Sequence, residues 1–167
     1  MSAGRLPLPD DASAGPELAA EYTAARKRTG GVMAILRAMG PRAEVVRAFL
    51  DMTEAVLYGP AALGRREREL LALATSEANG SGYSAEVHAA LLEECGGGPD
   101  GSERDAALVA FARSLTLDPG EGPTAVAALS DVLSADEVHD AIAVVGLLNL
   151  ANRAALATAI GTADDLS

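Results

Sequence analysis

Residues 65–88 read RRERELLALATSEANGSGYSAEVH and are the most informative stretch of the chain. The first half places leucine and alanine at helical spacing, and Asn79-Gly80 is a dipeptide that typically ends a helix. A second helix is expected from Ser81 to Glu94, because the glycines at 96–98 favour a helix stop. The stretch therefore predicts two consecutive helices joined by a tight turn.

The second of these helices carries Ser81, Ser84 and His88 on one face. Their offsets of 0, 3 and 7 residues place them within about 60° of one another, at roughly 100° per residue. Glu69 lies on the preceding helix, twelve residues before Ser81. An antiparallel pairing of the two helices would bring its carboxylate near that face, which makes the four residues a candidate site.

The same residues also permit a purely structural interpretation. Ser81 or Ser84 could cap the helix, as serine at a helix start commonly does. His88 could be a partly buried polar side chain, and Glu69 could be a surface partner of Arg65 four residues earlier. From these residues alone, both interpretations remain open.

The rest of the chain also has helical patterning. Aromatic residues make up 3%, and no segment alternates β-branched and polar residues over any length. Residues 1–16 are expected to form a flexible or extended arm, and residues 17–167 a single compact all-α domain of about six or seven helices. Long helices are expected at 16–28, 42–57, 64–78, 81–94, 102–115 and 134–160, with short helical segments at 32–39 and 124–133.

Composition excludes several classes of function. The 24 acidic and 13 basic residues give a net charge of −11, which argues against nucleic-acid binding. Cys95 is the single cysteine, so no internal disulfide or cysteine-only metal cage can form. No phosphate-binding glycine motif occurs, and neither a metal nor a cofactor is expected. Asn149, Asn152 and Arg153 interrupt the most apolar stretch, so we expect a soluble, cytoplasmic protein without a membrane segment.

The stretch at 65–88 resembles a known motif. The redox branch of the alkylhydroperoxidase D-like and carboxymuconolactone decarboxylase superfamily has a Glu, a helix ending in Asn-Gly, then Cys-x-x-Cys and a His four residues later. Here Glu69, Asn79-Gly80, Ser81-Gly82-Tyr83-Ser84 and His88 stand at the matching spacings. The resemblance covers about residues 30–160, including 31–36, 57–59 and 145–153, of which the last resembles the C-terminal helix of the peroxidase-related subgroup. It implies the helical fold of that superfamily.

Both cysteine positions of the motif are serine in this chain. The family's thiols reduce a hydroperoxide and then close a disulfide, steps for which a serine hydroxyl has no equivalent. Cys95 lies eleven residues after Ser84 on the same helix, about 16 Å away at the rise of an α-helix, and cannot substitute. As it stands, the chain is not expected to be a thiol peroxidase.

Three interpretations of the serine pair follow from the resemblance. The first is a cofactor-free acid–base enzyme of the decarboxylase, lyase or isomerase type, because the decarboxylase branch works without a redox dithiol. Glu69 and His88 would then transfer protons, with Ser81, Tyr83 and Ser84 donating hydrogen bonds to the substrate. The second is a non-catalytic binding or assembly homologue. The third is an alkyl hydroperoxide reductase whose two cysteines have been changed to serine by engineering.

A serine hydrolase is a further alternative outside these classes. Ser84 and His88 could form a nucleophile–base pair, with Glu69 or Glu77 orienting the histidine. The GxSxG motif and the strand–turn–helix context of such enzymes are absent from the sequence, which disfavours this reading.

The expected partners are a small organic substrate, such as a lactone, a carboxylic acid or a biosynthetic intermediate, and further copies of the chain. Family members assemble as trimers or hexamers, so a homo-oligomer is implied here. Asn149 and Asn152, nearly one turn apart on the last helix, are candidates for substrate binding. Their alternative role is hydrogen bonding within a helix–helix interface.

Overall fold

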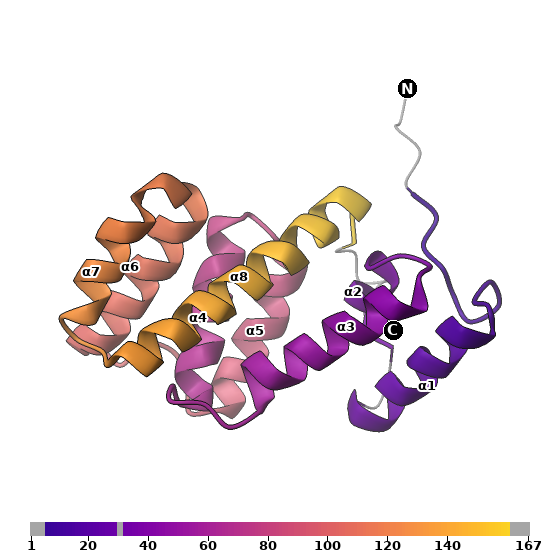
Figure 1. Ribbon diagram of the computed structural model, residues 1–167, viewed down its shortest axis with the longest axis horizontal. Helices are drawn as coiled ribbons and strands as arrows, with labels where there is room; N and C mark the ends of the chain where they lie inside the picture. The colour runs from indigo at the N-terminus through magenta and orange to yellow at the C-terminus, as the bar shows by residue number, and fades with distance from the viewer. Residues whose placement is uncertain (1–5, 30–31, 161–167) are drawn as a thin grey trace.

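The computed structural model describes residues 6–29 and 32–160 of the chain. Within them all regular secondary structure is helical, as expected for an all-α domain (Figure 1). The helix stop predicted at Gly30-Gly31, the first five residues of the arm, and residues 161–167 lie outside the described residues.

The described residues contain eight α-helices, where about six or seven were expected; α2 and α7 are the short ones. Two further helical turns are a π-helix, η1, and a 3₁₀ turn, η2. In chain order the elements are α1 (Pro16–Thr29), α2 (Ala34–Ala38), α3 (Ala43–Thr53), η1 (Glu54–Tyr58), α4 (Arg65–Ala78), α5 (Gly82–Glu94), α6 (Glu103–Leu117), η2 (Pro119–Glu121), α7 (Gly122–Ser130) and α8 (Ala135–Thr158).

The helix predicted over 42–57 changes character after Thr53. Helix α3 continues there as the π-helical turn η1, closed by a 2.7 Å hydrogen bond from the Gly59 N–H to the Glu54 carbonyl. The buried Arg68 side chain donates from Nη1 to the carbonyls of Val56 and Gly59, at 3.2 and 2.9 Å. This contact from another helix satisfies carbonyls at the end of the turn. Local periodicity does not reveal it, so the π-turn was not predicted.

Helix α4 lies at the centre of the domain and packs against α5, α6 and α8. In Figure 1, α6 and α7 lie together at one end of the molecule, α1 lies at the other, and α8 runs across the middle. Fully buried side chains such as Leu71, Ala72, Leu108 and Val144 belong to one continuous apolar core. The turn between α4 and α5 uses a left-handed glycine, Gly80, with φ of 68°, which confirms the predicted break.

Helix α8 begins with the capping box that the sequence predicts. The Ser134 hydroxyl accepts from the Glu137 N–H, and the Glu137 carboxylate accepts from the Ser134 N–H. Among the described helices, α8 is the one long and apolar enough to cross a membrane, but half of the relevant window is buried inside the protein. Because it packs against α2, α4, α5, α6 and α7, it is a core helix of a globular domain.

The described part of the N-terminal arm is irregular in backbone conformation but is not free of the domain. The Pro9 carbonyl accepts hydrogen bonds from the Tyr22 hydroxyl and from Arg37. Asp11 forms an ion pair of 2.6 Å with Arg26 of α1. These contacts join Pro9 and Asp11 to α1 and α2, and the expectation of a flexible or extended arm stays a prediction.

Two polar contacts fix the start of α4 against α8. The Asp140 carboxylate accepts from the backbone N–H groups of Ala62 and Leu63, at 2.6 and 2.9 Å. Arg104 of α6 bridges Glu67 of α4 and Glu137 of α8. Together they hold the helix that carries Glu69 in register with the core.

We predict that Glu137→Gln lowers stability at neutral pH but not in acid. Hydrogen bonds from Arg104 and Ser134 lower the pKa of Glu137 to about 2, whereas an unfolded glutamate titrates near pH 4.3. The stabilisation is therefore complete above about pH 5 and is lost as the pH falls from about 4.3 towards 2. Urea denaturation is expected to give a deficit of about 1 kcal/mol at pH 7 that shrinks by pH 3.

Asp136→Asn is the matched control, because Asp136 lies beside Glu137 in the first turn of α8 and is exposed. Its unfolding free energy at pH 7 should change by no more than about 0.5 kcal/mol, as for other exposed surface substitutions. A deficit in Glu137→Gln that is the same at pH 7 and pH 3 would contradict the assignment of the stabilisation to the ionised carboxylate.

Candidate functional site

Glu69 and His88 form a buried contact between α4 and α5. The Glu69 side chain is fully buried, and its Oε2 lies 2.7 Å from His88 Nδ1. The two helices pair as the sequence predicts, because the turn at Gly80 reverses the chain between them. The pairing places the Glu69 carboxylate at the predicted face of α5.

Arg65 holds the other oxygen of the same carboxylate. Its Nε and Nη2 donate to Glu69 Oε1 at 2.8 and 2.5 Å. The guanidinium also lies 4.0 Å from the centre of the Tyr58 ring, a cation–π contact that joins η1 to α4. The i,i+4 pairing considered in the sequence therefore exists, but it is buried at the Glu69 end rather than lying on the surface.

The partners of Glu69 keep it ionised. Burial raises the pKa of Glu69, but the hydrogen bonds from His88 and Arg65, with the positive charge of the guanidinium, outweigh burial and leave the pKa below its ordinary value. A carboxylate can only accept, so His88 Nδ1 carries the hydrogen of their contact. In a neutral ring, Nε2 is then the acceptor and can take up a proton.

Ser81 and Ser84 lie together at the start of α5. Ser81 occupies the N-cap position, but its side chain makes no capping hydrogen bond. Instead its hydroxyl donates to Ser84 Oγ at 3.2 Å, and both side chains are buried. The capping interpretation of the Ser81 side chain is therefore wrong, and the two hydroxyl groups form a pair in the interior.

A cavity of about 260 Å³ opens onto this region between α5, α8 and the α2–α3–η1 segment. Tyr83, Ser84 and His88 line it, whereas Glu69 and Ser81 do not. Tyr58 and Thr53 contribute the other hydroxyl-bearing side chains. The remaining lining residues are apolar: Met33, Ile35, Phe49, Leu57, Val87, Leu91, Leu147, Leu148 and Ala151.

Asn149 and Asn152 do not line this cavity. Asn149 accepts from Asn79 at 2.9 Å and donates to Thr116 at 3.2 Å, which links α8 to the end of α4 and to α6. Asn152 is fully buried and shares hydrogen bonds with Ser76 of α4. The geometry supports the alternative role in a helix–helix interface rather than the predicted role in substrate binding.

The sequence analysis did not identify Tyr58 as part of the site. It considered Arg65 only as a surface partner of Glu69. The Arg65–Glu69 spacing was a usable signal, but it did not indicate that the pair would be buried. No sequence signal placed Tyr58, because its position depends on the π-turn that Arg68 holds from another helix.

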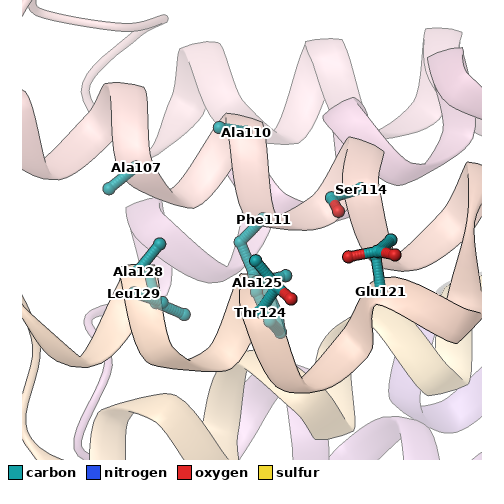
Figure 2. Close-up of a pocket in the computed structure, with 9 residues that line it drawn as sticks. All are labelled: Ala107, Ala110, Phe111, Ser114, Glu121, Thr124, Ala125, Ala128 and Leu129. Atoms are coloured by element: carbon teal, nitrogen blue, oxygen red, sulfur yellow. The ribbon is translucent and has the colours of Figure 1, made fainter.

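A second cavity, of about 340 Å³, lies between α6 and α7 (Figure 2). Four alanines, at 107, 110, 125 and 128, line much of it, and Glu121 lies at one end. Among the described residues that line it, Glu121 is the only ionisable one and none is a histidine, whereas His88 lines the first cavity. Among the described residues, no cluster of three or more His, Cys, Asp or Glu is arranged to hold a metal ion.

The sequence matches the family model of the carboxymuconolactone decarboxylase family over residues 43–130, just over half of the chain. The chain belongs to this family. The matched segment contains α3 to α7 and therefore all of Glu69, Ser81, Ser84 and His88. A search of curated proteins gave no match.

Solved structures of similar fold agree with this family assignment. A peroxidase-related protein with an alkylhydroperoxidase core from Ralstonia eutropha JMP134 has a TM-score of 0.79 and 22% identity, with 97% of this chain and 93% of that chain covered. One from Silicibacter sp. TM1040 has a TM-score of 0.77 and 24% identity, covering 98% and 94%. The debrominase Bmp8, in a Cys-to-Ala variant bound to 2,3,4-tribromopyrrole, has a TM-score of 0.79 and 17% identity, covering 99% and 96%. At these identities the similarity establishes the fold.

We predict that the double variant Ser81→Cys, Ser84→Cys forms an internal disulfide. The two hydroxyl oxygens lie 3.2 Å apart, and rotation of the side chains can bring two sulfurs at these positions to bonding distance, about 2.05 Å. Mild oxidation should lower the intact mass by about 2 Da relative to the reduced form. Each single variant is the control and should keep its mass.

The family resemblance adds an expectation for activity. The wild-type protein should reduce no hydroperoxide with any dithiol donor, whereas the double variant should gain at least weak peroxidase activity. Hydroperoxide turnover by the wild-type protein would contradict the mechanism. A double variant that never closes the disulfide would contradict the geometry.

Proposed function

We propose that this protein is a cofactor-free acid–base enzyme that transfers a proton on a small organic molecule held in the 260 Å³ cavity. One observation carries the proposal: the fully buried Glu69 carboxylate lies 2.7 Å from His88 Nδ1, and the same histidine lines an apolar cavity. Reactions of the decarboxylase, lyase or isomerase type need such a base.

In this proposal His88 Nε2 removes a proton from the bound molecule. The imidazolium that forms is stabilised by the Glu69 carboxylate, 2.7 Å from Nδ1. The Ser84 hydroxyl and the Tyr83 side chain, both in the cavity wall, stabilise negative charge that develops on the substrate. The apolar surroundings strengthen these interactions, because little water screens them. Return of the proton from Nε2 to another atom completes an isomerisation. In a decarboxylation, Nε2 removes the proton of the carboxylic acid, the C–C bond breaks with release of CO₂, and Nε2 returns the proton to the remaining carbon.

Arg65 has a positioning role in this mechanism. Its two hydrogen bonds to Glu69 Oε1 leave Oε2 directed at His88. The positive charge of Arg65 also balances the negative charge of Glu69. The Arg65–Glu69 pair is therefore close to neutral overall in a buried site. Tyr58, stacked on the guanidinium, limits the movement of Arg65.

The relatives are compatible with this chemistry. The family takes its name from a decarboxylase, and the debrominase Bmp8 holds a small halogenated ring on the same fold. These likenesses support a small organic ligand for this chain, and the reaction is inferred from its own residues.

The Ser81–Ser84 contact favours a second candidate function. Two cysteines at these positions would provide the dithiol of an alkyl hydroperoxide reductase, with Glu69 and His88 placed for proton transfer. Under this alternative the serines replace cysteines of the natural protein, and the intact mass of the natural protein distinguishes the two functions. A non-catalytic binding homologue is the third possibility.

We also propose a homo-oligomer, trimeric or hexameric, in the cytoplasm. Helix α8 leaves Ile142, Leu150 and Leu156 exposed along its outer side, with exposed fractions of 38%, 52% and 49%. Burial of such a surface against further copies of the chain would remove it from water.

We predict that Glu69→Gln and His88→Ala each slow proton transfer by about 10²–10⁴-fold. The first removes the charge that stabilises the imidazolium, and the second removes the base. Because the substrate is unknown, lactones, ketones and carboxylic acids should be incubated with the protein in D₂O and followed by NMR for enzyme-dependent C–H exchange.

His139→Ala is the control for this experiment, because His139 lies exposed on α8 and bonds to a backbone carbonyl of its own helix. It should exchange substrate hydrogens at the wild-type rate. Circular dichroism should confirm that all three variants remain folded. Wild-type exchange rates in both site variants would remove Glu69 and His88 from the mechanism.

We predict that light scattering gives a mass three or six times the 16.9 kDa of the chain. Leu150→Glu should reduce this mass, because it places a charge on the exposed side of α8. Leu117→Glu, which makes the same change at a more exposed leucine at the end of α6, should leave the mass unchanged. A monomer at micromolar concentration would contradict the proposal.

A further inference from the structure

We infer that the cavity beside His88 selects uncharged, mainly apolar molecules of about one substituted ring and rejects carboxylates. This narrows the proposed function to the lyase and isomerase types, whose substrates need no carboxylate, and it rests on that function for the placement of the polar end of the ligand at His88 and Ser84. The selection itself follows from the cavity wall and can be measured without turnover.

With His88 in the neutral form that the proposed base requires, the wall of the cavity offers no charged partner to a ligand. Nine of its lining side chains are aliphatic, phenylalanine or methionine, and the others are Thr53, Tyr58, Tyr83, Ser84 and His88. Lysine, arginine, aspartate and glutamate are absent from the described residues that line it. A carboxylate that entered would lose its hydration and gain hydroxyl donors but no full positive charge, which is unfavourable.

Arg65, a cation near His88 but outside the cavity, already has its charge balanced by Glu69. Arg65 does not line the cavity; its guanidinium is stacked on Tyr58 and bonded twice to Glu69. Glu69 carries a negative charge directly behind His88, and this charge opposes a second anion in the cavity. The N-terminus of α5 adds only a partial positive charge, about half a unit. A partial positive charge can stabilise negative charge that develops on the ligand during a reaction. It does not compensate the full charge of a ligand that binds as an anion.

The volume sets the size of the ligand. An apolar cavity of about 150 Å³ accommodates benzene, so the cavity of about 260 Å³ accommodates about ten non-hydrogen atoms by proportion. A single ring with one or two small substituents meets this limit. Together, size and lining define an uncharged aromatic or alicyclic ketone, ester, lactone or phenol as the class of ligand.

A pair of probes of equal size tests the inference. 4-Methylacetophenone and 4-methylbenzoate have the same number of non-hydrogen atoms. The ketone carries a methyl group where the benzoate carries its second carboxylate oxygen. Isothermal titration calorimetry at pH 7.5 should detect the ketone, with 4-methylbenzoate at least tenfold weaker. Equal or tighter binding of 4-methylbenzoate would overturn the inference, as would failure of the ketone to bind at millimolar concentration.

Two variants locate the binding in this cavity. Val87→Phe fills part of it and should weaken ketone binding at least tenfold, whereas Val109→Phe, the same change at a half-buried position on α6 outside the cavity, should not. Met33→Lys introduces a cation at the wall and should improve binding of 4-methylbenzoate relative to the ketone. Met39→Lys, at the other end of α2 and outside the cavity, is its control. Retention of ketone binding in Val87→Phe would place the binding site elsewhere and overturn the inference.

The outcome is independent of the catalytic test. Preference for the ketone in Glu69→Gln would support the cavity assignment even if that variant showed no loss of proton exchange. Conversely, exchange that depends on Glu69 and His88 together with preferred binding of 4-methylbenzoate would preserve the proposed function and overturn this inference.

Discussion

The buried carboxylate of Glu69 is the constraint on which the site depends. A charge with no exposure to water is tolerated only when partners surround it, and here His88 takes one oxygen while Arg65 takes the other. Those partners come from α5 and from the first turn of α4, and Arg65 brings η1 into the network through Tyr58. One charged group thus fixes three segments relative to each other. Loss of either partner would leave an under-compensated charge in the core.

The same network holds His88, which also lines the cavity. Ionised Glu69 determines which ring nitrogen of His88 carries the hydrogen and leaves the other nitrogen free to accept a proton. The serine pair lies one and two turns before His88 on the same helix, so hydroxyl donors and base are held on one rigid element. The apolar wall of the cavity, which α2, α3, η1 and α8 supply, then separates the serine pair and His88 from water. In the proposed mechanism, stability and reactivity therefore depend on the same few hydrogen bonds.

Membership of the carboxymuconolactone decarboxylase family explains the scaffold, and the similarity to solved structures at 17–24% identity establishes the fold alone. A fold of this kind accommodates different reactions, so the identity of the residues at 81 and 84 matters more than the overall likeness. Serine at both positions retains hydrogen bonding but removes thiol chemistry. The hydrogen bonds and charges of Glu69, Arg65 and His88 do not require a thiol at either position.

Local patterns in the sequence determined most of the helices. The capping box at Ser134, the break at Asn79-Gly80 and the shared face of Ser81, Ser84 and His88 all depend on residues within a few positions of one another. Only the tertiary structure decided that Arg68 holds a π-turn before Gly59, that Tyr58 stacks on Arg65, and that the asparagines of α8 face α4 and α6 rather than the cavity. Those outcomes depend on contacts between helices far apart in the chain. Local sequence patterns reveal how far apart such residues lie along the chain. They do not reveal the distances between these residues in space.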